Sequence, residues 1–287
     1  TALSYIDEKT GQMDMMIQFQ CVTADCLLTD WIPLPFSLRK LKRAFSSWQN
    51  QLRGRSWNML YLENHDHPRI ISRYGSEALW KESGKALAVS YLFQQGTPFL
   101  YQGQEIGMLN WRPNDPDMYE DVQTRYTYEH SNLKASPEKR LKKLWRSSRD
   151  SARTPVQWDS SANAGFTTGN PWFYVNENYV DVNVAAQELD EDSVLNFYRK
   201  AIALRKALPV VKDGTYQDHF FMSGKRYVYS RDNGKQKLLV MCSFSKLPIS
   251  VKVPAGFDLG KAKLILQSYP EAKDMLQPYE ARVYLWE

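Results

Sequence analysis

The chain has 287 residues, 43% of them hydrophobic, so it can bury a large core as one large domain or as one large and one small domain. Its formal charge of +5 comes from 37 basic and 32 acidic residues, with basic clusters only at 39–43 and 139–149. Because both clusters lie on helix-like segments, they are interpreted as solvated helix faces, which argues against a nucleic-acid partner. No stretch approaches the roughly 20 apolar residues of a membrane helix, so no membrane partner is predicted.

The three cysteines, Cys21, Cys26 and Cys242, form an odd number and lack the spacing of metal ligands. This pattern indicates reduced thiols instead of a disulfide framework or a zinc site. We therefore expect a cytoplasmic protein, and the sequence predicts no metal or other cofactor.

Strand and helix patterns alternate in the first part of the chain. A strand is predicted over residues 15–19, and Ser37 caps a helix whose apolar side chains fall on one stripe. A strand over 59–62, a helix over 76–95 and a strand over 97–101 follow. This β-α-β-α-β order predicts parallel strands with right-handed crossovers, as in a barrel or a doubly wound sheet.

The stretch from residue 110 to 178 is irregular, apart from a helix predicted to begin at Ser136 and Pro137. A further helix begins at Asp192 or Ser193 and is stopped by Pro209. These patterns place the end of the first domain near Leu208.

Beyond Leu208 the apolar pattern changes to a period of two. Residues 227–230 and 238–241 predict a hairpin around the turn Asp232-Asn233-Gly234. Further strands are predicted over residues 249–253, 263–266 and 281–286. The sequence therefore predicts two domains, 1–208 with alternating helices and strands and 209–287 with antiparallel strands only.

Polar side chains follow two of the predicted parallel strands directly. Asn64, His65, Asp66 and Arg69 come after the strand over 59–62, and Glu105 comes after the next strand. These residues can serve simply as turn formers and caps. A carboxylate, an imidazole and a guanidinium at one strand end also suit a polyhydroxylated substrate and a positively charged transition state.

Three longer segments carry a resemblance to a known family. They are Asn64-His65-Asp66-x-Pro68-Arg69, the run from Gly96 to Met108 (GTPFLYQGQEIGM), and Arg149-Asp150-x-Ala152-Arg153-Thr154-Pro155-x-Gln157-Trp158. Together they resemble glycoside hydrolase family 13, the α-amylase family, and in particular its bacterial oligo-1,6-glucosidase and α-glucosidase branch. The resemblance extends in order over nearly the whole chain and is weaker after the predicted domain boundary.

The resemblance implies a fold and a set of residue roles. The fold is the C-terminal part of a (β/α)8 TIM barrel, about three β/α units, followed by a small antiparallel β-sandwich. Asp66 matches the third family carboxylate, which stabilises the transition state, and His65 would hydrogen-bond the same sugar. Arg153, or else Arg149, would reach the non-reducing end of that sugar, so we expect all of them to face one cleft. Asn64 and Arg69 would position the strand end, while Glu105 and Gln102 would brace the rim.

In the family the nucleophilic Asp and the acid/base Glu lie on the fourth and fifth barrel strands, and residues 15–19 resemble the sixth strand. The resemblance therefore implies that both groups precede Thr1 and that this chain is the C-terminal portion of a longer enzyme. Retention requires two carboxyl groups about 5–5.5 Å apart, and neither Glu63 nor Glu105 is expected to meet this condition with Asp66.

The predicted function is a retaining α-glucosidase that acts on short oligosaccharides, with this chain inactive on its own. Its expected partners are the oligosaccharide and either the other half of the barrel or a second copy of the chain. Gln104 and Glu63 depart from the residues usual in the branch, which leaves specificity open. Trehalose-6-phosphate hydrolase, sucrose isomerase and trehalose synthase remain alternatives within the family. A non-catalytic carbohydrate-binding or scaffolding relative is the alternative from another class.

Overall fold

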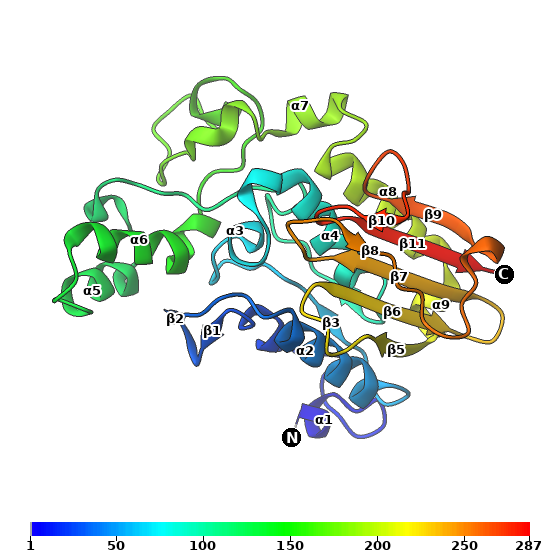
Figure 1. The fold of residues 1–287 in the computed structure, drawn as a ribbon. Helices are drawn as coiled ribbons and strands as arrows, with labels where there is room; N and C mark the ends of the chain where they lie inside the picture. The colour runs from blue at the N-terminus through cyan, green and yellow to red at the C-terminus, as the bar shows by residue number, and fades with distance from the viewer. Residues whose placement is uncertain (1) are drawn as a thin grey trace.

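The structure is a computed structural model and describes residues 2–287 (Figure 1). The first elements are helix α1 (Ala2–Ile6), the antiparallel strands β1 (Cys26–Leu27) and β2 (Thr29–Pro33), and helix α2 (Leu38–Leu52). The Ser37 hydroxyl accepts a hydrogen bond from the Lys40 amide at 3.4 Å, so the predicted cap of α2 is confirmed.

The strand predicted over residues 15–19 is wrong, because these residues have no strand pairing in the structure. The Tyr61 hydroxyl donates a hydrogen bond to the Gln18 carbonyl at 2.6 Å, so the segment lies against the residues after β3 through a side chain. A strand requires a backbone partner as well as an apolar pattern, and the pattern alone cannot supply that partner.

The parallel pair of strands consists of β3 (Met59–Leu60) and β4 (Thr97–Pro98), with Met59 opposite Thr97. Both strands are shorter than predicted. The connection contains helices α3 (Ile70–Tyr74) and α4 (Trp80–Leu92), with a 3-10 turn at Glu77–Leu79 where the sequence predicts one continuous helix from 76 to 95. Side chains from α2 and α4 share one hydrophobic core.

The irregular region after β4 contains helices α5 (Val122–His130), α6 (Pro137–Ser147) and α7 (Val184–Leu189). The Ser136 cap of α6 is confirmed, since its hydroxyl accepts from the Lys139 amide, whereas α5 and α7 were not predicted. Helices α5 and α6 lie at the side of the molecule opposite the C-terminal sheet (Figure 1).

Helix α8 (Val194–Ala207) begins after the N-cap Ser193, and Pro209 ends it and opens the short helix α9 (Pro209–Asp213). The main sheet has the order β5-β6-β7-β11-β9, and β8 and β10 form a separate antiparallel pair. The strand bounds are β5 (Thr215–His219), β6 (Arg226–Asp232), β7 (Lys237–Ser243), β8 (Ile249–Ser250), β9 (Lys263–Gln267), β10 (Met275–Leu276) and β11 (Ala281–Trp286). The prediction of antiparallel strands in this region is confirmed.

The two faces of the main sheet pack differently. Tyr227, Tyr229 and Val240 point into the large core that includes residues of α2, α4 and α8. Their neighbours Val228 and Leu239 point into a smaller cluster on the other face. The C-terminal sheet therefore shares its main core with the preceding helices. No helix in the described residues is long and apolar enough to cross a bilayer.

Candidate functional site

The turn after β3 is fixed by its own side chains. The Asn64 side-chain oxygen accepts a hydrogen bond from the Asp66 amide at 2.8 Å, which is a local turn of the type Asx residues favour. The buried Glu63 carboxylate accepts from the Ile70 amide at 2.8 Å and binds Arg69 at 3.1 Å. Glu63 and Asn64 thus hold the turn from both ends and leave the Asp66 carboxylate partly exposed.

Three cationic or polar groups surround Asp66. His65 Nε2 lies 3.2 Å from Asp66 Oδ2, and Arg149 Nη1 lies 3.2 Å from Oδ1. Arg153 Nη2 is 3.4 Å from the same Oδ1, and its Nε donates to the His65 carbonyl at 3.1 Å. The structure therefore brings together the four residues that the sequence assigns to one cleft, although more than eighty positions separate the arginines from Asp66.

The two arginines are held from behind by buried aspartates. Asp121 Oδ1 lies 2.7 Å from Arg149 Nε and 3.7 Å from Arg153 Nη1, while Asp150 Oδ1 lies 3.4 Å from Arg153 Nη1. The other Asp121 oxygen caps α5 by accepting from the Thr124 amide at 2.9 Å. Burial disfavours ionised Asp121, but hydrogen bonds from Thr124 and Arg149 outweigh burial and lower its pKa.

Asp150 is fully buried, and one of its oxygens accepts from the amides of Glu120 and Asp121 at 2.8 and 2.9 Å. Its pKa is raised because the cost of burial exceeds the effect of these hydrogen bonds. Asp150 thus joins the turn that carries the arginines to the segment that leads into α5.

A second buried network, centred on Arg69, supports the site. Arg69 donates to the Gln102 carbonyl at 2.6 Å and to the Ser151 carbonyl at 3.2 Å, so it joins the segments after β3 and β4 to the arginine turn. Its guanidinium also lies 5.5 Å from the centre of the Tyr101 ring. Burial raises the pKa of Glu63, and the opposing charge of Arg69 only partly offsets this effect.

The residues after β4 act differently from one another. In the described part of the chain, the Glu105 side chain makes no hydrogen bond or ion pair. Gln104 is buried and donates to the hydroxyls of Tyr91 and Tyr198 at 3.3 and 3.2 Å, and Gln102 contributes its backbone carbonyl to Arg69. The bracing predicted for Glu105 is thus carried by its neighbours.

Sequence reasoning missed the role of Asp121. It lies in the irregular stretch, where the only local signal is its position just before a helix, and nothing local indicates that it reaches Arg149. It also missed the pair formed by His67 and Asp30, whose Nδ1 and Oδ2 atoms lie 2.6 Å apart. Asp30 belongs to β2, far from His67 in sequence, so only the fold reveals this contact.

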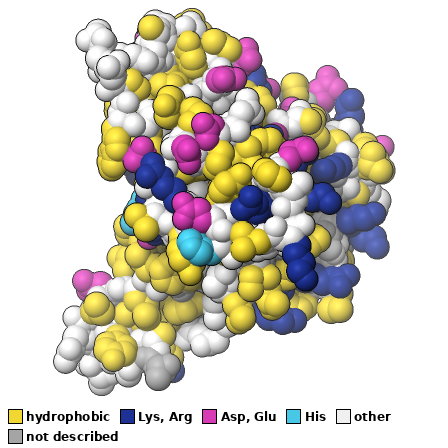
Figure 2. All heavy atoms as spheres, turned by 90° about the vertical axis from the view of Figure 1, so that its left-hand side faces the viewer, with side chains coloured by type: hydrophobic (Ala, Val, Ile, Leu, Met, Phe, Trp, Pro, Cys, Tyr) yellow, Lys and Arg dark blue, Asp and Glu magenta, His cyan; other side chains and the backbone are white. Residues whose placement is uncertain are grey.

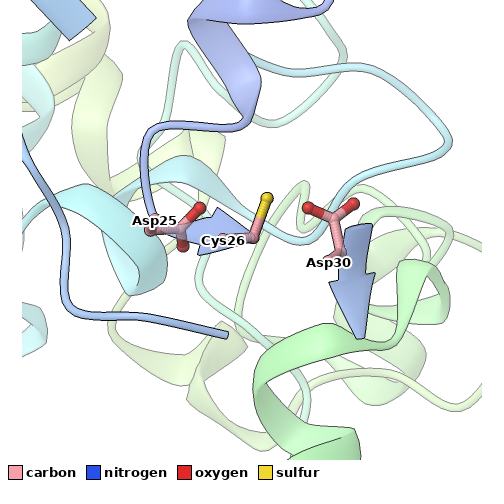
Figure 3. A group of neighbouring side chains, drawn as sticks. All are labelled: Asp25, Cys26 and Asp30. Carbon is pink, nitrogen blue, oxygen red and sulfur yellow. The ribbon is translucent and has the colours of Figure 1, made fainter. Parts of the chain in front are cut away.

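Asp25, Cys26 and Asp30 lie close enough for one ion to contact all three, and Figure 3 shows Cys26 between the two carboxylates. Both carboxylates already bind the buried Arg73, Asp25 at 2.6 Å and Asp30 at 2.9 Å. Burial, with the nearby aspartates, raises the pKa of Cys26 to about 11, which disfavours the thiolate that a metal needs. These residues form an ion-pair cluster around Arg73 and do not fit a metal site.

Two pockets meet at Arg149. One, of about 290 Å³, is lined by Asp66, His67, Asp30 and Trp31 among others. The other, of about 550 Å³, is lined by Arg153 and by aromatic side chains. On the face drawn in Figure 2, acidic, basic and histidine side chains gather near the centre, with hydrophobic side chains around them.

This arrangement can be compared with known proteins. The family model described as the catalytic domain of α-amylase matches residues 1–214. The chain belongs to the α-amylase family, glycoside hydrolase family 13. The prediction of that family is thereby confirmed, and the family model covers the region that contains Asp66, Arg149 and Arg153.

Similar proteins include an oligo-1,6-glucosidase of Parageobacillus thermoglucosidasius, 38% identical over 98% of this chain and 52% of that protein. A trehalose-6-phosphate hydrolase of Bacillus subtilis is 36% identical over the same shares. The crystal structure of the trehalose-6-phosphate hydrolase of Bacillus licheniformis matches with a TM-score of 0.93 at 34% identity, over 100% of this chain and 54% of that one. The chain thus spans about half the length of the relatives it matches.

Proposed function

We propose that this chain is the C-terminal part of a retaining α-glucosidase that hydrolyses α-glucosidic bonds in short oligosaccharides. The single observation that carries the proposal is the meeting of His65, Arg149 and Arg153 at the Asp66 carboxylate. Similarity to oligo-1,6-glucosidases supports the choice of reaction. In this proposal residues 1–208 form the last three units of a (β/α)8 barrel, and 209–287 form a β-sandwich domain.

The proposed role of Asp66 follows from charge. Cleavage of a glycosidic bond passes through a transition state with positive charge on the sugar ring. Asp66, Asp121 and Asp150 form ion pairs with the guanidiniums of Arg149 and Arg153, and these five residues are here called the Asp66 cluster. Asp66 is its partly exposed carboxylate, which suits stabilisation of that transition state.

His65 and Arg153 supply hydrogen bonds in this proposal. The His65 ring is mostly exposed beside Asp66, so it can reach a sugar hydroxyl without losing a buried partner. Arg153 is fixed by Asp150 and by the His65 carbonyl, which leaves its guanidinium pre-oriented next to Asp66.

The nucleophile and the acid/base are proposed to come from outside these 287 residues. Several carboxylates of the described residues around the site are already engaged, because Asp121 and Asp150 bind arginines, Glu63 binds Arg69, and Asp30 binds His67 and Arg73. A retaining enzyme needs two further groups about 5–5.5 Å apart across the scissile bond. We therefore propose that the active enzyme combines this chain with a segment that completes the barrel.

An uncharged substrate is favoured over a sugar phosphate, the substrate named for one group of relatives. A phosphate is held best by cations that have no other anionic partner. Arg149 contacts two carboxylates and Arg153 contacts three, so both guanidiniums already have anionic partners. The described side of the cleft thus lacks a free cation for phosphate.

The role of Asp66 is tested in an enzyme that contains both this chain and the completing segment. Asp66→Asn should lower kcat by on the order of a hundredfold, because it removes the preorganised charge and keeps the shape of the side chain. Asp115→Asn, at an exposed cap that lines neither of the two pockets at Arg149, should leave kcat unchanged. Turnover of isomaltose by Asp66→Asn at the unsubstituted rate would rule out this role.

A further inference from the structure

The larger pocket beside the Asp66 cluster has an aromatic wall. Trp172 is 80% exposed, and its ring centre lies 4.8 Å from that of Phe173, which is buried. Both line the pocket of about 550 Å³ together with Tyr101. Phe173 thus contacts the Trp172 ring, while most of the Trp172 side chain is exposed in the described part of the chain.

Other residues that line this pocket are held by polar contacts. Tyr101 donates its hydroxyl proton to the Ala152 carbonyl at 3.0 Å and packs against the Arg69 guanidinium. Arg149 and Arg153 line the same pocket, and both contact Asp66. The pocket therefore lies beside the two arginines that contact Asp66, the carboxylate that we propose binds the terminal sugar.

The chemistry of this lining selects an uncharged amphipathic ligand. An exposed indole offers a flat apolar face, while a pyranose ring offers C–H groups on its faces and hydroxyls on its edges. The two arginines are already paired with Asp66, Asp121 and Asp150, so they can donate hydrogen bonds to hydroxyls but do not attract an anion.

We propose that Trp172 stacks against the second glycosyl unit of the substrate, the one released as leaving group, and so sets a preference for oligosaccharides over glucose. This inference deepens the proposed function and rests on it, since Asp66, His65 and Arg153 must hold the first unit. Trp172 is a binding residue in this scheme and takes no part in the chemical step.

The test measures equilibrium binding of glucose and of isomaltose to the 287-residue chain by NMR titration. Trp172→Ala should weaken isomaltose binding about five- to tenfold and change glucose binding by less than twofold. Trp172→Phe should restore most of the lost affinity, because it keeps an aromatic face. Since Trp172 is largely exposed, both variants should keep the thermal stability of the unsubstituted chain.

Trp158→Ala is the matched control, because Trp158 is 50% exposed on the same irregular region and does not line this pocket. It should leave both affinities unchanged. Unchanged isomaltose binding in Trp172→Ala, or an equal loss for both sugars, would overturn the inference while Asp66→Asn still weakens glucose binding. If the unsubstituted chain binds neither sugar, the inference is overturned. If Asp66→Asn binds both sugars normally, the proposed role of Asp66 fails and the inference fails with it.

Discussion

At the residue scale, the exposed and the buried carboxylates of the Asp66 cluster have different roles. Asp66 faces the cleft, whereas Asp121 and Asp150 are buried behind Arg149 and Arg153. A buried carboxylate without a partner would cost several kcal/mol, so the arginines stabilise the aspartates as much as the aspartates orient the arginines. Asp66 and His65 could be assigned from a short sequence motif. Asp121 could not, because its role depends on contacts with residues 28 and 32 positions away that no local pattern encodes.

Asp121→Asn separates the orienting role from the capping role. Asparagine still caps α5, but Arg149 loses the nearer and buried one of its two ionic partners, so we expect a loss of about 1–3 kcal/mol in the free energy of unfolding. Because the pKa of Asp121 is lowered in the folded state, its stabilisation is complete above the unfolded value of about 3.9 and disappears as the pH falls through the folded value.

Urea unfolding at pH 7 and at successively lower pH measures this effect. The difference between the unsubstituted chain and Asp121→Asn should shrink once the pH falls below about 4. Asp115→Asn is the control, because Asp115 also accepts an amide hydrogen bond at a helix start but binds no arginine. A difference that stays constant down to acid pH would contradict the ionic role of Asp121.

At the element scale, the signals that the sequence encodes locally are the ones that the structure reproduces. Ser37, Ser136 and Ser193 cap the predicted helices, because a cap is a contact between residues two or three positions apart. The strand over 15–19 fails, because strand formation depends on a distant backbone. The 3-10 turn before α4 was likewise not predicted, since the apolar pattern runs through it without a break.

Gly96 lies where the chain approaches the segment before β3 closely, just before β4 begins. It precedes β4 with a φ of +141°, and a Cβ at this position would overlap the Asn58 carbonyl next to β3. Gly96→Ala should therefore cost more than the roughly 1 kcal/mol expected for a strained φ alone. Gly54→Ala is the matched control, because Gly54 has a φ of +64° but open space around it. Equal losses of melting temperature in the two variants would show that the close approach does not matter.

The contact between α2 and β5 contains an aspartate that opposes folding at neutral pH. Burial raises the pKa of Asp218 to about 6, although Lys42 and a hydrogen bond from Ser46 act in the opposite direction. Because this folded value exceeds the unfolded value of about 3.9, stability falls as the pH rises from about 4 to about 6 and is level above that range.

Asp218→Asn should therefore stabilise the chain by about 1–2 kcal/mol at pH 8, after allowance for partial solvent screening, and by almost nothing at pH 4. Denaturant unfolding at the two pH values measures the difference. Asp274→Asn, at an exposed position beside β10, should have no effect at either pH. A loss of stability in Asp218→Asn at pH 8 would refute the sign of this prediction.

At the scale of the whole molecule, the exposed apolar side chains are unevenly distributed. Many lie in the first part of the chain, including Tyr5, Met13, Ile17, Phe19, Leu27, Leu28 and Ile32. Phe19 and Leu28 line the same pocket as Asp66, so part of this set of side chains, here called the residue 5–32 face, adjoins the cleft. Figure 2 shows many hydrophobic side chains in the lower part of the face that it draws. An apolar surface next to a short parallel strand pair suits a protein partner.

This face leads to a prediction for the chain by itself. In the absence of a segment that covers the residue 5–32 face, the chain should self-associate, because burial of the face stabilises the contact by roughly 25 cal/mol per Å² of apolar surface. Sedimentation velocity at increasing protein concentration should show a rising mass, and Phe19→Lys with Leu28→Lys should reduce it. Leu247→Lys changes a leucine outside the face that is 71% exposed, against 87% for Leu28, and should leave the association unchanged. Assays of the same samples with isomaltose should show no turnover, because the two missing carboxyl groups are proposed to come from the completing segment. A chain that stays monomeric at high concentration would contradict the role assigned to the face, and turnover by the chain alone would contradict the proposed division of the catalytic groups.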